Sequence, residues 1–297
     1  MLACSEKSAE IEGLRPLFGI LGEPLPLERT GKGPRIITVT SGNAGVGKSS
    51  VVINLAAVLA REGGRVLVVD ADNACTLLGK RPAHNLYHVL GGERRPREIV
   101  VQDAPGIDIL PAGMGVQQYA ALAPHDRGRV VAAMKEVSAG YDFFLIDTGA
   151  GISANVTSFA VHHQEILLVL TPELSSLTDA YALLKTLSAR NGSMAFRIVV
   201  NKCKSVEEGD ALFRKLTTIT GRFLEVSVEY FGCLLTDESF AEAARHRKAL
   251  CRLFPDTPPA LEFARLAQKI TAEGGIVGAP VPLEPQAKEW RNHELSS

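Results

Sequence analysis

The sequence predicts an α/β fold, a doubly wound and mostly parallel sheet with helices on both faces. Three observations support this fold class. From Arg35 to Ile270, short β-branched runs alternate with longer segments whose apolar residues have helical spacing. The runs IITV, VLVV, FFLI and ILLVL are apolar at every position, which is typical of strands buried on both faces. With 297 residues, 46% of them apolar, the chain is long enough for a large core.

Seven strands are predicted from runs of β-branched and aromatic residues. They cover residues 36–40, 65–69, 107–110, 143–146, 166–170, 197–200 and 226–231. Eight helices are predicted from apolar residues spaced three or four apart. They cover residues 49–61, 116–122, 128–139, 153–161, 177–189, 206–220, 239–250 and 259–270. Because helices separate the strands, neighbouring strands should run parallel.

This alternation argues for a single P-loop domain over residues 35–270. Residues 1–34 are predicted to be a leader and linker, since Gly and Pro are frequent from residue 22 onward. Residues 271–297 mix Gly, Pro and polar residues without a period, which is typical of a flexible tail. Trp290 in this tail is either an incidental exposed side chain or an anchor for a partner.

The composition excludes several classes of protein. Thirty-two basic and thirty-three acidic residues leave a net charge of −1, and 6% of residues are aromatic. These values argue against a strongly basic nucleic-acid binder and against an acidic disordered protein. No apolar run approaches the roughly 20 residues of a membrane span, and the first residues do not resemble a signal peptide. Five scattered cysteines without a CxxC pair predict reduced thiols in the cytoplasm and no zinc site.

The strongest motif is a phosphate-binding loop, G-x(4)-G-K-[ST], between a predicted strand and a predicted helix. It consists of Gly42, Asn43, Ala44, Gly45, Val46, Gly47, Lys48 and Ser49. Glycines allow tight turns whose N–H groups point inward and form a nest for anions at a helix N-terminus. Lys48 would bind the β- and γ-phosphates, and the Ser49 hydroxyl would be placed for Mg²⁺. No G-x-G-x-x-G follows the strand, which excludes a dinucleotide-binding fingerprint.

Two further predicted strands end in carboxylates. Asp70 and Asp72 follow the run VLVV, and Asp147 follows the run FFLI. Ligands of open parallel sheets bind outside the carboxyl ends of the strands, where Asp side chains can hold Mg²⁺. Any one of the three could instead cap a helix. All three beside a phosphate-binding loop favour a site for a metal and a nucleotide.

Four segments carry a family resemblance: ITVTSGNAGVGKSS, VLVVDAD, YDFFLIDTGAGIS and LLVLTPELSSLTDAYALLKTL. They resemble the MinD/ParA group of ATPases, and within it the FlhG (FleN) family of flagellar-number regulators. ILPAGMGVQQYAAL and the region from FRIVVNK to LCRLFPDTPPALEFARLA extend the resemblance over residues 35–270. It implies a P-loop NTPase fold of the deviant Walker A type. It also implies a molecular switch that binds ATP and Mg²⁺, hydrolyses ATP weakly and regulates flagellar number or placement.

The resemblance implies roles for single residues. The loop from Gly42 to Ser50 would bind the nucleotide phosphates, with Lys48 also contributing to catalysis and Ser49 ligating Mg²⁺. Asn201 would recognise adenine at the end of its strand, although without the resemblance it would be taken as a turn residue.

The carboxylates also receive roles from the resemblance. Asp147 would hold the metal through water, Asp70 would lie close to that metal shell, and Asp72 would orient the attacking water. The implied partners are a second copy of the chain in an ATP-dependent homodimer, an FlhF-like GTPase, flagellar switch proteins or a flagellar transcription regulator. The chain would be cytoplasmic and would reach the membrane through partners.

The sequence departs from the family in four places. Asn43 stands where the family has a signature lysine that reaches across the ATP-bound dimer, and Asn carries no charge. The switch segment after Asp72, residues 73–79, is shorter than in relatives. Ala9-Glu10 replace the Asp-Gln that precedes the Leu-Arg pair in the family's activating helix. The tail lacks a basic amphipathic helix that would bind membranes.

The sequence leaves two alternative functions open: an ATP-bound scaffold that barely hydrolyses ATP, and a ParA-like DNA-associated positioning ATPase. Residues 93–97, ERRPR, are interpreted as a solvated loop, with a contact to phosphate backbones as the alternative. His162 and His163 are interpreted as structural. Asp237 and Glu238 are interpreted as helix-capping residues, which the resemblance also places near the nucleotide.

Overall fold

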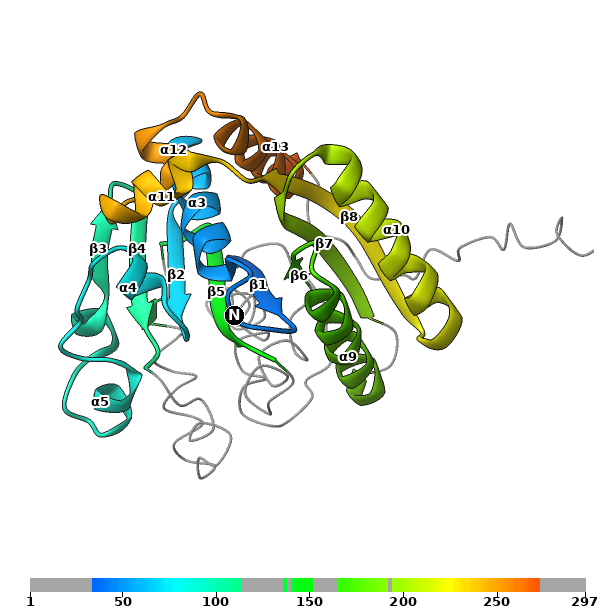
Figure 1. Ribbon diagram of the computed structural model, residues 1–297. Helices are drawn as coiled ribbons and strands as arrows, with labels where there is room; N and C mark the ends of the chain where they lie inside the picture. The colour runs from blue at the N-terminus through cyan, green and yellow to red at the C-terminus, as the bar shows by residue number, and fades with distance from the viewer. Residues whose placement is uncertain (1–33, 114–135, 138–139, 152–164, 192–193, 273–297) are drawn as a thin grey trace, which may run out of the picture.

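The structure is a computed structural model that describes residues 34–113, 136–137, 140–151, 165–191 and 194–272 (Figure 1). Within them, eight strands form one sheet in the order β3-β4-β2-β5-β1-β6-β7-β8. The strands are β1 (Arg35–Ser41), β2 (Val66–Asp70), β3 (Val101–Ala104), β4 (Ile107–Pro111), β5 (Phe143–Ala150), β6 (Glu165–Leu170), β7 (Met194–Cys203) and β8 (Val226–Leu235). All neighbours pair in parallel except β3 and β4, which are antiparallel.

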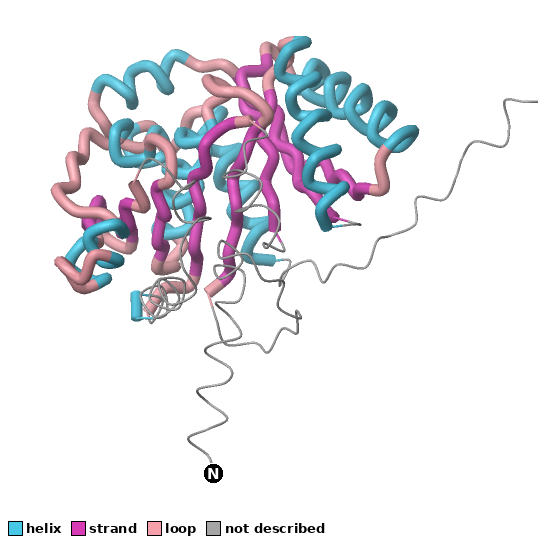
Figure 2. Tube along the Cα trace, turned by 90° about the horizontal axis from the view of Figure 1, so that it is seen from below, coloured by secondary structure: helices cyan, strands magenta, loops and turns pink. Residues whose placement is uncertain are grey.

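Helices cover both faces of this sheet, and Figure 2 shows the strands as one continuous layer with helices around it. They are α3 (Lys48–Arg61), α4 (Ala74–Leu77), α5 (Leu86–Leu90), the 3₁₀ helix η2 (Pro96–Ile99), α9 (Leu174–Asn191), α10 (Val206–Phe223), α11 (Glu238–Arg245), α12 (Leu250–Leu253) and α13 (Pro258–Ala272). One face packs against α3, α4 and α11 to α13. The other packs against α5 and η2 over β2, β4 and β5, and against α9 and α10 over β6 to β8. The predicted doubly wound α/β fold is therefore confirmed.

The central strands are apolar because their residues are buried on both faces. Val66–Asp70 is buried at all five positions and Glu165–Leu170 at all six. Burying that many apolar side chains supplies the dominant favourable free energy of folding. None of the described helices is long and apolar enough to cross a membrane.

The parallel register brings the carboxyl ends of the central strands together. On β5, Asp147 pairs with Asp70 of β2 on one side and with Val39 of β1 on the other. β1 then leads through the glycine loop into α3. Residues far apart in the sequence therefore meet at one edge of the sheet, where ligands of this architecture bind.

The structure corrects several predicted elements. One helix over residues 239–250 was expected, but α11 ends at Arg245 and α12 begins at Leu250, because Arg247 adopts a left-handed backbone with φ 53°. Strand β3 was not predicted, since its alternating VQDA gives a weak signal and it forms the antiparallel edge of the sheet. The helices α4, α5 and η2 were also missed because each has at most five residues.

The interpretation of residues 93–97 was partly right, and some other predictions concern residues that the structure does not describe. Residues 93–97 were interpreted as a solvated loop, but η2 begins within them at Pro96, which is buried while the three arginines are exposed. Several predictions lie outside the described residues and are not tested. They are the helices expected at 116–122 and 153–161, nearly all of the helix expected at 128–139, and the interpretations of His162, His163 and Trp290.

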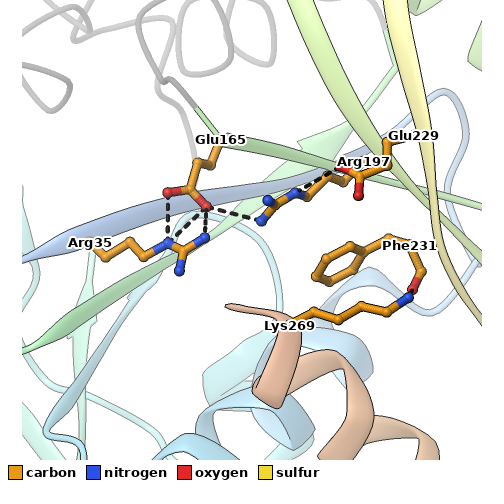
Figure 3. Close-up of polar contacts among 6 residues, drawn as sticks. All are labelled: Arg35, Glu165, Arg197, Glu229, Phe231 and Lys269. Carbon is orange, nitrogen blue, oxygen red and sulfur yellow. Dashed lines mark hydrogen bonds and ion pairs between the residues drawn. The ribbon is translucent and has the colours of Figure 1, made fainter. Parts of the chain in front are cut away.

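A partly buried ion network connects the amino-terminal halves of three central strands and β8 (Figure 3). Glu165 of β6 accepts hydrogen bonds from the guanidinium of Arg35 on β1, at 2.7 and 2.9 Å, and from Arg197 on β7, at 3.3 Å. Arg197 also pairs with Glu229 and lies 4.9 Å from the ring centre of Phe231. Since Glu165 is 5% exposed, its charge is stabilised by the two arginines rather than by water.

Candidate functional site

The glycine loop between β1 and α3 leaves the N-terminus of α3 open. Gly45 and Gly47 have φ of 78° and 94°, a region that favours glycine. Gly47 is the N-cap and has no side chain to accept the first N–H groups of the helix. Lys48 and Ser49 are buried in the first turn of α3. The first N–H groups of the helix, which lack a side-chain cap, and a buried lysine form a site suited to a multiply charged anion such as a phosphate chain.

Two glycines of the loop are needed for close packing. A Cβ atom on Gly42 would lie 2.2 Å from the backbone carbon of Asp179 in α9. A Cβ atom on Gly47 would lie 2.4 Å from Nδ2 of Asn201, at the end of β7. Any larger residue would push the loop away from α9 or from β7.

The carboxylates after β2 have different partners. Asp72 forms an ion pair with Lys48, with Oδ2 and Nζ 3.3 Å apart. Asp70 instead accepts the backbone N–H groups of residues 72, 74 and 75, at 3.2, 3.0 and 2.8 Å. Asp70 thus fixes the start of α4 and the position of Asp72, and both of its oxygens are already hydrogen-bonded.

Asp147 is the most deeply buried of these carboxylates, with 0% exposed. Burial raises the pKa of its carboxyl from 3.8 to about 7, while the Ser49 hydroxyl that hydrogen-bonds to it acts in the opposite direction. Its Oδ2 accepts the N–H of Asn73 at 3.4 Å, whereas its Oδ1 is buried with no hydrogen-bond partner among the described residues. A hard cation or its bound water would satisfy this oxygen, so Ser49 and Asp147 fit a Mg²⁺ ion.

Asn43 points toward α9 of its own chain. Its Oδ1 accepts a hydrogen bond from the Ser176 hydroxyl at 3.2 Å. Its backbone carbonyl accepts the Ser41 hydroxyl at 2.6 Å. The side chain at this position is therefore used within the subunit, a contact that the sequence did not predict.

Asn201 lies against the loop from the other side. Its Nδ2 donates to the carbonyl of Val46 at 2.7 Å, and its Oδ1 accepts the N–H of Lys202 at 2.9 Å. The sequence predicted a contact with adenine for this side chain. In the structure Asn201 is 5% exposed and lies on the wall of a cavity beside the loop.

This cavity has a volume of about 570 Å³ and adjoins the loop at Gly47 and Ser50. Its walls come from the start of α3, the ends of β7 and β8, and α11, with apolar side chains such as Ile53, Leu235 and Phe240. Its volume and mostly apolar lining suit a base and ribose whose phosphates reach the loop. Sequence reasoning missed most of this wall because its residues carry no motif. Of the residues beyond the loop, the resemblance placed Asn201 and Asp237 near the nucleotide, and Asp237 caps α11 by accepting the N–H of Ser239 at 2.8 Å.

Comparison with known proteins agrees with this geometry. Residues 34–195 match the family model of an AAA domain. The chain is 38% identical to the antiactivator FleN of Pseudomonas aeruginosa, over 85% of this chain and 89% of that protein. It is 29% identical to the flagellum site-determining protein YlxH of Helicobacter pylori, over 75% and 76% of the two chains.

Among solved structures, the septum site-determining protein MinD of Pyrococcus horikoshii OT3, in complex with Mg-ADP, is similar in fold. It superposes with a TM-score of 0.64 at 25% identity, covering 80% of this chain and 96% of that one. The same motifs that line the site here, from the glycine loop to the strand-end carboxylates, carried the resemblance seen in the sequence. The chain belongs to the MinD/ParA family of P-loop ATPases, in the branch of the flagellar regulators FlhG and FleN.

Proposed function

We propose that this protein is an Mg²⁺- and ATP-binding switch that hydrolyses ATP slowly and regulates the number or placement of flagella. One observation supports nucleotide binding above all others. The N-terminus of α3 is open, Lys48 is buried in its first turn, and Lys48 and Ser49 both act on Asp147, whose Oδ1 has no hydrogen-bond partner among the described residues. This pairs a site for anionic phosphate with a site for a cation, as MgATP requires.

Different residues of the site would bind the phosphates and the metal ion. The loop from Gly42 to Ser50 would surround the phosphates with N–H groups, and Lys48 would neutralise the β- and γ-phosphates. Ser49 and Asp147 would hold Mg²⁺, which neutralises the charge that develops on the phosphates. Asp70 would add negative charge near the ion while it anchors α4.

Asp72 and Asn201 would complete the site. Asp72 would exchange Lys48 for the attacking water once the phosphates bind. Asn201 would contact the adenine base from the wall of the cavity.

Thermal melting tests the binding part of this proposal. At a concentration 100 times its Kd, MgATP should stabilise the fold by about 2.7 kcal/mol, a melting shift of several degrees. Lys48→Ala should lose this shift because the buried ammonium is removed, and Lys204→Ala, at an exposed lysine after β7, should keep it. An equal shift in Lys48→Ala and in the wild type would refute the phosphate site.

A second candidate, an ATP-bound scaffold that barely hydrolyses, is favoured by Asn43. Its side chain is uncharged and bonded to Ser176 of the same subunit, so it offers no charge to a partner's phosphates. A phosphate-release assay separates the two. A slow but Asp72-dependent release supports the switch, and release no faster than in Asp72→Ala supports the scaffold.

The flagellar role draws its support from FleN and YlxH, whose names describe an antiactivator and a flagellum site-determining protein. The proposed partners are a second copy of the chain and flagellar proteins such as an FlhF-like GTPase, switch proteins or a transcription regulator. The proposed location is the cytoplasm, with membrane contact through these partners. Counting flagella in a deletion strain, complemented with wild type or Lys48→Ala, tests this role. An unchanged count after deletion would contradict it.

A further inference from the structure

Two consecutive residues at the end of β7 hold two consecutive carbonyl groups of the phosphate-binding loop. Lys202 Nζ donates to the carbonyl of Gly45 at 2.7 Å, and Asn201 Nδ2 donates to the carbonyl of Val46 at 2.7 Å. Lys202 and Gly45 are 157 positions apart in the sequence. Both bonds use carbonyl groups of the loop, and neither uses the N–H groups that would bind a phosphate.

These carbonyls determine where the loop's N–H groups point. In a trans peptide, the carbonyl of one residue and the N–H of the next lie in one plane and point in opposite directions. When Lys202 holds the Gly45 carbonyl, it therefore also directs the N–H of Val46 to the opposite side. Asn201 does the same for the N–H of Gly47. Because glycines allow peptide planes to rotate at low cost, a loop with Gly at positions 45 and 47 needs such external contacts.

The backbone at Lys202 is itself unusual. Its φ is 59°, and Lys202 and Arg247 are the two non-glycine residues with positive φ among the described residues. A left-handed backbone is unfavourable for a residue with a Cβ atom. The N–H of Lys202 donates to Asn201 Oδ1 at 2.9 Å, which links the two loop contacts to each other. Glycine would adopt this backbone without strain, but glycine could not donate the hydrogen bond that the lysine side chain makes to the Gly45 carbonyl.

We propose that Lys202 is a positioning residue, which orients the loop's N–H groups for phosphate through its bond to the Gly45 carbonyl. The inference rests on the proposed nucleotide binding and extends it to a residue that touches no reacting atom. Lys202 would therefore affect binding of the phosphates, whereas its neighbour Asn201 lies on the wall of the cavity that would hold the base and ribose.

Three substitutions separate this role from a structural one. Lys202→Met removes the donor and keeps the stem, Lys202→Arg restores a donor, and Lys202→Gly removes the donor while relieving the left-handed strain. Lys204→Met is the matched control, since Lys204 is an exposed lysine two residues along the chain. The readouts are the Kd of MgADP, the inhibition constant of adenosine against a fluorescent ADP analogue, and the melting temperature without nucleotide.

Lys202→Met and Lys202→Gly should both weaken MgADP binding about five- to tenfold, the size expected for one ordinary hydrogen bond, because Lys202 is exposed and its charge is screened by water. Adenosine should bind within about twofold of wild type, because it lacks the phosphates that the loop binds. Lys202→Arg should recover most of the MgADP affinity, and Lys204→Met should resemble wild type. Lys202→Gly should melt no lower than Lys202→Met because strain is relieved, so affinity and stability should not change in parallel.

Three results would overturn the inference: MgADP affinity unchanged in Lys202→Met, adenosine and MgADP weakened equally, or MgADP affinity recovered in Lys202→Gly in step with its stability. If the wild-type protein itself binds no MgADP, the proposed function fails, and this inference fails with it. If the wild type binds and Lys202→Met binds equally well, only the role of Lys202 is refuted.

Discussion

The side-chain oxygen of Asn43 accepts a hydrogen bond from the hydroxyl of Ser176, with 3.2 Å between the two atoms. The same hydroxyl oxygen accepts the backbone N–H of Thr171 at 3.0 Å, and Ser176 is 1% exposed. The second residue of the loop is therefore connected to the β6–α9 junction of its own subunit. At this position the family resemblance places a lysine that reaches into a second subunit.

Replacing Asn43 tests whether the presence of asparagine instead of the family's lysine slows ATP hydrolysis. Asn43→Lys, combined with Ala44→Gly so that the loop can turn as in relatives, should raise the rate of phosphate release. A charge supplied from a second subunit stabilises the phosphoryl transition state, and comparable arginine fingers contribute roughly 10³ to 10⁵ in rate. The increase in hydrolysis rate should be smaller in this protein, because the switch segment at residues 73–79 is shorter than in relatives.

The control for this gain is the same double substitution with Asp72→Ala, which should abolish it. If the wild type already hydrolyses ATP as fast as Asn43→Lys does, another residue supplies the charge and the explanation through Asn43 is wrong.

The ion pair between Lys48 and Asp72 should oppose nucleotide binding. ATP must displace the Asp72 carboxylate from the lysine, and Asp72 is 24% exposed. Asp72→Asn should therefore raise MgATP affinity about fivefold, the effect of a partly screened ion pair of about 1 kcal/mol, while it lowers hydrolysis. Isothermal titration calorimetry measures the affinity. Asp142→Asn, which removes an exposed carboxylate beside Arg65, should leave it unchanged, and a weaker affinity in Asp72→Asn would contradict the prediction.

Asp147 should make the metal-free protein less stable as pH rises. Burial raises the pKa of its carboxyl from 3.8 to about 7, so the folded state binds this proton more tightly than the unfolded state. The favourable contribution is complete below about pH 4 and is lost as pH rises through about 7. With EDTA present, Asp147→Asn should gain stability over wild type across this range, by up to roughly 4 kcal/mol.

Urea unfolding at several pH values measures this difference. The pKa of Asp237 is instead lowered by its hydrogen bonds with Ser239. Asp237→Asn should therefore lose stability relative to wild type above about pH 4, the opposite sign. A stability difference between Asp147→Asn and wild type that does not change with pH would show that Asp147 does not titrate in this way.

Glu165 should be essential to stability and irrelevant to nucleotide affinity. Glu165→Ala leaves the buried guanidinium of Arg197 and the half-buried one of Arg35 without their shared acceptor, and should destabilise the fold by roughly 3 to 5 kcal/mol. Glu242→Ala removes an exposed pair with Arg245 and should cost less than about 1 kcal/mol. Urea unfolding measures both. Because Glu165 lies at the amino end of β6, away from the loop, folded Glu165→Ala should bind MgATP as wild type does, and a loss of affinity would refute this separation.

Local sequence was sufficient for the elements whose signal lies within a few residues. Apolar runs predicted the central strands because a strand buried on both faces must be apolar throughout. Helix α11 shows the limit of such reasoning. The run SFAEAARHRKAL has helical spacing to its end, yet the chain leaves the helix after Arg245, and Arg247 packs its side chain over Gly79. A contact across the fold there overrides local propensity.

The sequence by itself determined the phosphate-binding loop, the carboxylates at the ends of two strands and the fold class, since each depends on neighbours along the chain. Only the tertiary structure decided which of these groups pair: Asp72 with Lys48, Asp70 with the start of α4, Asn43 with Ser176, and Lys202 with Gly45. Two of these contacts join residues 133 and 157 positions apart. Such contacts depend on the order and register of strands in the sheet, which arise from the packing of the whole core rather than from any short segment.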